Sequence, residues 1–159
     1  MNNDGENIHA TAIVVGTTGL LFIGPSGAGK SALAFSCMAE AASLGLFSAL
    51  IADDRVILSA HGEHLLARCP QSIVGLIELR HAGIAKVECL PAALVHVAVL
   101  PVASGAADRL PPENERFSTS SGRELPIVRV PVGIARPFAF TMALISPQAA
   151  NDPIEIRTF

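Results

Sequence analysis

The first part of the chain alternates between short apolar runs and glycine-rich breaks. Residues 10–15 and 20–23 are apolar runs of strand length, and the glycines between them suit a tight hairpin turn. Residues 31–44 then place apolar side chains close to helical spacing, and Gly45 is a suitable C-cap. The pattern predicts a hairpin, a glycine-rich loop at 24–30 and one long helix.

Beyond this helix the chain returns to strand-length runs separated by turn residues. The predicted strands are 48–52, 56–59, 64–68, 73–79, 84–87 and 94–100, with two closing strands at 127–132 and 138–145. Residues 101–126 carry four prolines and a Ser-Thr-Ser-Ser-Gly run, which predicts a long loop. One helix among many strands argues against a regular βαβ chain. We therefore expect a single α/β domain over 1–159 with a mixed sheet, a core at about 9–147 and an irregular tail at 147–159.

Composition narrows the class of protein. Half of the residues are apolar and the mean hydropathy is +0.48, so the chain can bury a core. The net charge is −3, no basic run exists, and Trp and Tyr are absent, which argues against nucleic-acid binding. Three widely spaced cysteines form no disulfide framework and are expected to be reduced core thiols.

The N-terminal residues argue against export and membrane insertion. The acidic start lacks the positive region of a secretory signal, and the apolar stretch at 10–24 is too short and too broken to span a bilayer. The sequence predicts a cytoplasmic protein.

Residues 24–31, Gly-Pro-Ser-Gly-Ala-Gly-Lys-Ser, match the phosphate-loop pattern G-x-x-x-x-G-K-[ST]. The glycines let backbone N–H groups turn toward phosphate oxygens, and the following helix adds its free N–H groups. Lys30 can reach the β- and γ-phosphates of ATP, and Ser31 can ligate Mg²⁺. The alternative is an ordinary glycine-rich turn before a helix. The predicted nucleotide-binding residues are Gly24, Pro25, Ser26, Gly27, Ala28, Gly29, Lys30 and Ser31.

Two carboxylates follow the apolar strand predicted at 48–52. Side chains at the end of a buried strand lie at the sheet edge where phosphate loops also lie. One of Asp53 and Asp54 can hold Mg²⁺ through water, while the other takes a proton from an attacking hydroxyl. The alternative is a solvated turn in which Arg55 pairs locally. The neighbouring phosphate loop favours the functional interpretation.

A third carboxylate, Glu78, precedes Arg80 by two residues, so in an extended segment both side chains point to one face. A carboxylate for Mg²⁺ beside a cation for phosphate is consistent with the same site. Spacing alone instead favours a salt bridge on a wet face.

Together these segments resemble the HPr kinase/phosphorylases, bacterial enzymes that phosphorylate a serine of the phosphocarrier protein HPr and can reverse the reaction. The resemblance extends from His9 to about Pro147. The chain is similar to the short form of the family, which has the catalytic domain only. It is carried by His9 at 22 residues before Ser31, by the phosphate loop, by Ile51-Ala52-Asp53-Asp54-Arg55-Val56, by Glu78-Leu79-Arg80-His81-Ala82-Gly83-Ile84, by Asp108-Arg109-Leu110 and by Pro131-Val132-Gly133-Ile134-Ala135-Arg136.

The resemblance implies a role for each matching residue. Asp54 would accept the seryl proton and donate it in the reverse reaction, His9 would be the active-site histidine, and Arg109 would be a catalytic arginine. Glu78 would join Ser31 on Mg²⁺. The predicted catalytic residues are His9, Lys30, Asp54 and Arg109, the predicted metal ligands are Ser31, Glu78 and Asp53, and the predicted cofactors are ATP and Mg²⁺.

The family's fold resembles that of phosphoenolpyruvate carboxykinase, with a phosphate loop on a mixed β-sheet. The implied partner is HPr, and the implied assembly is a homo-oligomer such as a hexamer. Gly133 stands where the family has a cation in the segment linked to dephosphorylation, which counts against the reverse reaction. Two other functions fit the phosphate loop: a small-molecule kinase, and an ATP-sensing regulatory module with little chemistry of its own.

Overall fold

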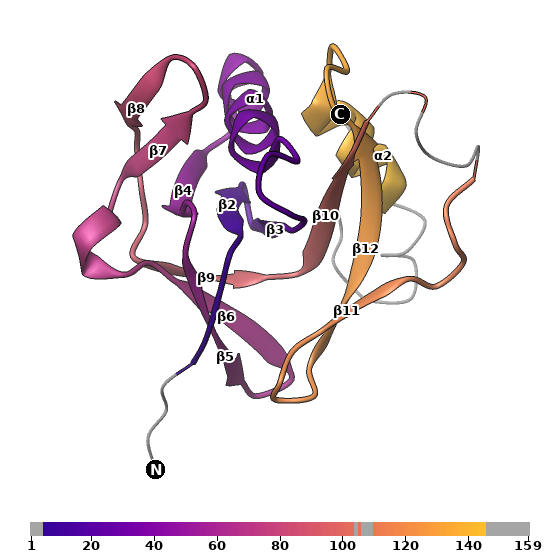
Figure 1. Cartoon of the computed structure of the whole chain (residues 1–159). Helices are drawn as coiled ribbons and strands as arrows, with labels where there is room; N and C mark the ends of the chain where they lie inside the picture. The colour runs from indigo at the N-terminus through magenta and orange to yellow at the C-terminus, as the bar shows by residue number, and fades with distance from the viewer. Residues whose placement is uncertain (1–4, 104, 106–109, 146–159) are drawn as a thin grey trace.

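Six strands form a mixed sheet in the order β11-β12-β10-β3-β2-β4 (Figure 1). The computed structural model describes residues 5–103, 105 and 110–145. β10 runs parallel to both of its neighbours, whereas β2 is antiparallel to β3 and to β4. The strands of this sheet are β2 (Thr11–Val15), β3 (Thr18–Phe22), β4 (Ser48–Ala52), β10 (Val97–Val102), β11 (Arg116–Ser118) and β12 (Glu124–Pro131).

The remaining elements cover the two faces of this sheet. A second, four-stranded sheet has the order β1-β5-β6-β9, and β7 pairs with β8 in a separate hairpin. These elements are β1 (Glu6–Ile8), β5 (Val56–His61), β6 (His64–Arg68), β7 (Leu76–Leu79), β8 (Gly83–Lys86), β9 (Ala92–Val95), the short 3-10 helix η1 (Gln71–Ile73), and the helices α1 (Lys30–Ser43) and α2 (Pro137–Ile145).

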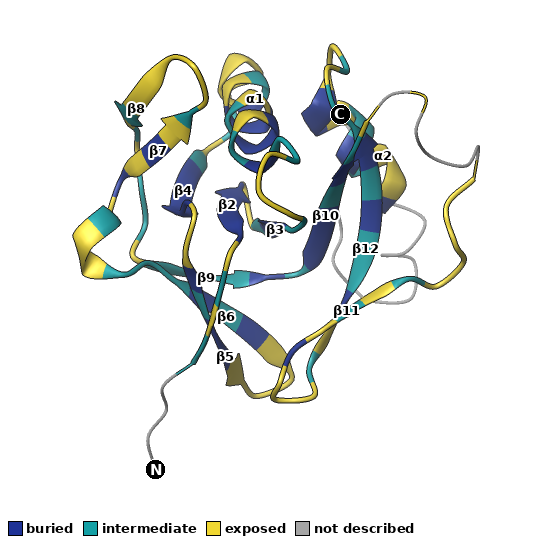
Figure 2. Cartoon of the chain, viewed as in Figure 1, coloured by how far each residue is buried: buried dark blue, intermediate teal, exposed yellow. Residues whose placement is uncertain are grey.

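Two apolar clusters fill the spaces on either side of the six-stranded sheet. One joins alternate residues of the sheet, such as Ile13 and Phe22, to α1, α2 and Ile77 of the β7–β8 hairpin. The other joins the intervening residues, such as Leu21, to the four-stranded sheet. The central strands and the inner face of α1 are accordingly buried (Figure 2). β2, β3 and β4 bury both of their faces, which explains why the sequence shows continuous apolar runs there.

Most of the predicted elements are confirmed, including the hairpin, the glycine-rich loop and the helix after it. The prediction of a strand at 138–145 is wrong, because these residues belong to α2. A short apolar run does not distinguish a buried strand from a buried helix. Pro137 begins α2, a position where its fixed φ and missing N–H are tolerated. Phe138, Thr141 and Ile145 are buried, at the spacing of three and four residues typical of one helix face.

Two further predictions need correction. The strand predicted at 94–100 is two strands, β9 and β10, which belong to different sheets and meet at His96. Part of the loop predicted at 101–126 is the β11–β12 hairpin. Pro101 is accommodated inside β10 because the pairing of β10 with β3 involves only residues 97–99, so no β3 partner awaits its missing N–H.

The three thiols are free, and Cys37 is the one that is fully buried. Burial raises the pKa of the Cys37 thiol to about 12. Cys69 and Cys89 are only partly buried, so the expectation of three core thiols holds fully for Cys37 alone.

Within the described ranges, neither helix has the length and apolar character needed to cross a membrane. The tail at 147–159 lies outside the described residues.

The start of α2 is capped by a side chain from α1. The carboxylate of Glu40 accepts hydrogen bonds from the backbone N–H groups of Phe138 at 2.8 Å and Ala139 at 3.3 Å, and from Nε of Arg136 at 3.3 Å. The first N–H groups of a helix have no partner inside the helix. Glu40 supplies those partners and so joins the two helices.

We therefore expect Glu40→Ala to lower the free energy of unfolding by about 1–2 kcal/mol, the range for loss of a helix cap. Urea denaturation followed by circular dichroism measures this change. Glu63→Ala is the matched control, because Glu63 pairs with Arg123 at an exposed site and its loss should cost less than about 0.5 kcal/mol. Equal effects of the two variants would contradict the capping role.

Candidate active site

A glycine-rich loop connects the C-terminal end of β3, a strand inside the six-stranded sheet, to α1; we call residues 24–29 the glycine loop. Gly24, Gly27 and Gly29 have φ values of +128°, +82° and +95°, which residues with a Cβ rarely adopt. Gly29 is the N-cap of α1 and offers no side-chain hydrogen bond to the first turn. The N–H groups of that turn are therefore available to an anion.

Lys30, the first residue of α1, folds back over the glycine loop. Its Nζ donates hydrogen bonds to the carbonyl oxygens of Gly24 at 2.8 Å and Pro25 at 2.9 Å. Burial lowers the pKa of Lys30, and the positive charge of Arg80 acts in the same direction, while Asp53 and Asp54 oppose it. The ammonium group thus stabilises the curled loop from within and lies among charged groups of both signs.

Arg80 reaches the glycine loop from the turn of the β7–β8 hairpin. A Cβ added at Gly27 would lie 3.1 Å from Nη1 of Arg80. The guanidinium group therefore lies directly against the loop, although Arg80 is 53 positions away in the sequence. The absence of a side chain at Gly27 leaves the room that this contact needs.

Asp53 lies at the centre of the site and is 4% exposed. Its Oδ1 accepts hydrogen bonds from Oγ1 of Thr11 and from Oγ of Ser31, both at 2.7 Å. Its Oδ2 accepts a hydrogen bond from the backbone N–H of Glu78 at 2.8 Å. One buried carboxylate therefore holds together β2, the first turn of α1 and the β7–β8 hairpin.

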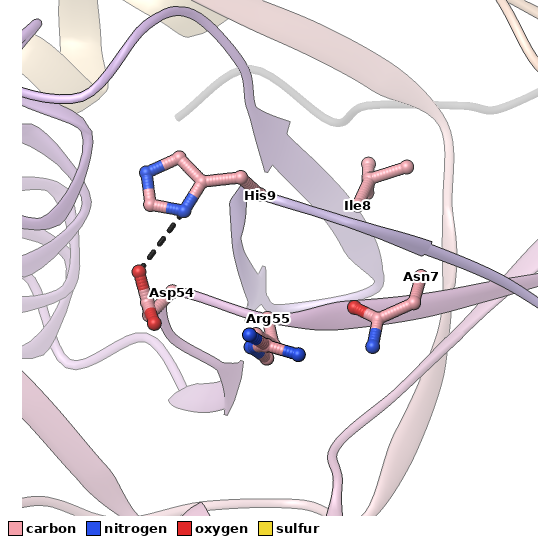
Figure 3. Close-up of a pocket in the computed structure, with 5 residues that line it drawn as sticks. All are labelled: Asn7, Ile8, His9, Asp54 and Arg55. Atoms are coloured by element: carbon pink, nitrogen blue, oxygen red, sulfur yellow. Dashed lines mark ion pairs between the residues drawn. The ribbon is translucent and has the colours of Figure 1, made fainter.

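The next residue, Asp54, is exposed and points outward. Its Oδ1 lies 3.0 Å from Nδ1 of His9, and Figure 3 shows the two side chains turned toward each other. Asp54 has a φ of +68°, a left-handed conformation that Asp tolerates better than most residues. Asn7, Ile8 and Arg55 join this pair around an open cavity of about 430 Å³.

The structure thus brings together most of the residues singled out in the sequence. Ser31 and Asp53 are in direct contact, and Glu78 contacts Asp53 through its backbone. Arg109 lies outside the described residues. Thr11 was not predicted, because a threonine that opens a strand carries no sequence signal for function. Arg80 carried a signal in its spacing from Glu78 but was not among the predicted site residues.

Comparison with protein families identifies the class of the domain. The model of the HPr Serine kinase C-terminal domain matches residues 3–93, more than half of the chain. The chain belongs to this family. The matched residues include the glycine loop, Asp53, Asp54 and Glu78, so the side chains that meet in the structure all lie within the part that defines the family.

The fold is also that of a solved HPr kinase. The structure of the Hpr(Ser) kinase/phosphatase from Coxiella burnetii matches with a TM-score of 0.71 and 22% sequence identity, over 92% of this chain and 97% of that chain. This match confirms the mixed α/β architecture with a multi-stranded sheet and few helices. Among curated proteins, a sequence search finds no match.

The two neighbouring aspartates allow a sharp test of this geometry. In Asp53→Asn, an amide nitrogen would face either the N–H of Glu78 or the hydroxyls of Thr11 and Ser31, all of which donate. We expect this variant to lose about 2 kcal/mol of unfolding free energy. Asp54→Asn should change it by less than about 0.5 kcal/mol, because the site is exposed and Asn tolerates positive φ.

Urea denaturation of both variants beside the wild type measures the difference. Similar losses for the two substitutions would show that Asp53 is not the buried anchor described here.

Proposed function

We propose that the chain is an ATP-dependent kinase that phosphorylates a serine of the phosphocarrier protein HPr. The observation that carries the proposal is the placement of two adjacent carboxylates. Asp53 faces inward to Ser31 at the glycine loop, whereas Asp54 faces outward to His9 beside an open cavity. A phosphoryl donor on the inner side and a hydroxyl acceptor on the outer side would meet between them.

The glycine loop suits the phosphates of ATP. Its three positive-φ glycines and the uncapped first turn of α1 offer backbone N–H groups to anionic oxygens. Lys30 would exchange its hydrogen bonds with loop carbonyls for contacts with the β- and γ-phosphates. Arg80, held against Gly27, would add a second positive charge over the transferred group.

The oxygen groups beside the loop fit Mg²⁺. Among the described residues, no group of three or more His, Cys, Asp or Glu side chains is placed to hold a metal on its own. Mg²⁺ in kinase sites is held by one or two protein oxygens together with phosphate oxygens and water. Ser31 and Glu78 would supply direct ligands. Asp53 would contribute through water while it accepts the hydrogen bond from the Ser31 hydroxyl. Mg²⁺ held by these residues would supply positive charge against the charge that develops during transfer.

Asp54 is the proposed base. Its carboxylate is accessible from the cavity formed with Asn7, Ile8 and Arg55, so a seryl hydroxyl can approach it. Asp54 would take the hydroxyl proton as the seryl oxygen bonds to the γ-phosphorus, while the bond from that phosphorus to the β-phosphate oxygen breaks and ADP leaves. His9, at 3.0 Å, would hold the carboxylate toward the incoming serine. Arg109 remains a proposed catalytic cation.

The partner and the assembly belong to the same proposal. HPr follows from the family to which the chain belongs, and a homo-oligomer such as a hexamer follows from the resemblance. Gly133, in the turn between β12 and α2, has no side chain to act on phosphoseryl-HPr, which supports the kinase direction over phosphorolysis. Native mass spectrometry of the full chain would measure the assembly.

The test is phosphate transfer from Mg·ATP to the HPr-like protein of the same organism, followed by intact mass spectrometry. We expect one phosphate on a serine of HPr with the wild type. Asp54→Asn should slow the transfer by roughly 10²–10⁴-fold, the usual contribution of a general base. Glu63→Gln, at an exposed ion pair away from the site, is the control that should leave the rate unchanged.

Other outcomes would overturn the proposal. ATP turnover with a metabolite and none with HPr would indicate a small-molecule kinase. Tight ATP binding that yields no phosphorylated product, with or without Asp54, would indicate a sensor.

A further inference from the structure

The pairing of β2 with β4 contains a bulge next to the site. Ile13 pairs with Leu50, but Ala12 pairs with Ala52, so Ile51 is an extra residue in β4. Leu50 packs in the cluster on the helix side of the sheet, whereas Ile51 and Ala52 both pack in the cluster on the opposite side. Bulges interrupt the alternation of side chains in this way and re-aim the residues that follow.

The bulge decides which way Asp53 points. In a regular strand, Leu50 on the helix side would put Asp53 on the opposite side, away from α1. Because Ile51 and Ala52 share one side, Asp53 instead faces the helix side, where Ser31 lies in the first turn of α1. The shifted register pairs Ala12 with Ala52, and Thr11, the residue before Ala12, donates its hydroxyl hydrogen bond to Asp53, the residue after Ala52.

Thr11 is fully buried, and its hydroxyl donates to the same Oδ1 atom that accepts from Ser31. The bond to Thr11 comes from the sheet and the bond to the N–H of Glu78 comes from the hairpin, so these two fix the carboxylate plane. Ser31 is the remaining donor. A serine oxygen that offers a lone pair to a cation must give its proton to another acceptor.

We infer that Thr11 is a positioning residue that orients Asp53 and, through it, the hydroxyl of Ser31 toward the cation of Mg·ATP. This inference rests on the proposed function. Outer groups that orient metal ligands typically change metal affinity by about 10–100-fold when they are removed. Thr11 would thus affect the gain in ATP affinity that Mg²⁺ provides and leave metal-free ATP binding unaltered.

The test uses isothermal titration of ATP with Mg²⁺ and with EDTA, and takes the ratio of the two dissociation constants. Thr11→Val keeps the branched shape and removes the hydroxyl, so we expect the ratio to fall by at least about tenfold. Thr11→Ser restores the hydroxyl and should return the ratio to within about threefold of the wild type.

Thr141→Val is the matched control. Thr141 is also fully buried, but its hydroxyl donates to the carbonyl of Pro137 within α2. Its loss should lower the melting temperature and leave the Mg²⁺ ratio unchanged. If Thr11→Val does not fold, Thr11→Ala provides a second hydroxyl-free variant for the same comparison.

The outcomes separate the two proposals. A wild type that gains no ATP affinity from Mg²⁺ would overturn the proposed nucleotide site itself. A wild type that gains affinity, together with a folded Thr11→Val that gains as much, would overturn only the role of Thr11. Failure of Thr11→Ser to restore the ratio would also count against it.

Discussion

One buried carboxylate organises the site. Removing an ionised carboxylate from water is costly unless hydrogen bonds replace its solvation, so such a group is found only where the surrounding structure supplies donors. Asp53 receives three donors, from β2, from the first turn of α1 and from the β7–β8 hairpin. Separating any of these elements would leave the charge under-solvated. The elements that carry the glycine loop, Ser31 and Glu78 are therefore held in place by the residue that they surround.

The adjacent carboxylate lies in the opposite environment, and this contrast underlies the proposed chemistry. Asp54 is exposed, has a left-handed backbone conformation and pairs with His9. Strained backbone positions of this kind persist where surrounding structure over-determines them, and they concentrate at functional sites. Two neighbouring aspartates would thus take two roles. The buried Asp53 faces the phosphate side, and the exposed Asp54 faces the acceptor.

Local signals predicted much of this arrangement. The glycine loop and the helix over 31–44 follow from glycine conformations and apolar spacing, which depend only on nearby residues. The segment 138–145 is predicted as a strand from the sequence, because its exposed face is apolar too, with Ala139, Ala143 and Leu144, and the run therefore has no readable period. The contact between Thr11 and Asp53 could not be predicted from the sequence. It depends on an unpaired residue, Ile51, which leaves the apolar pattern of the strand unchanged.

The most direct test is a crystal structure of the full chain with Mg²⁺ and a non-hydrolysable ATP analogue. The account predicts that the β- and γ-phosphates lie on the N–H groups of the glycine loop. The cation should lie beside Oγ of Ser31, with Asp53 still hydrogen-bonded to that serine and Asp54 facing the γ-phosphate. A triphosphate bound away from the loop, or an Asp53 turned away from Ser31, would contradict it.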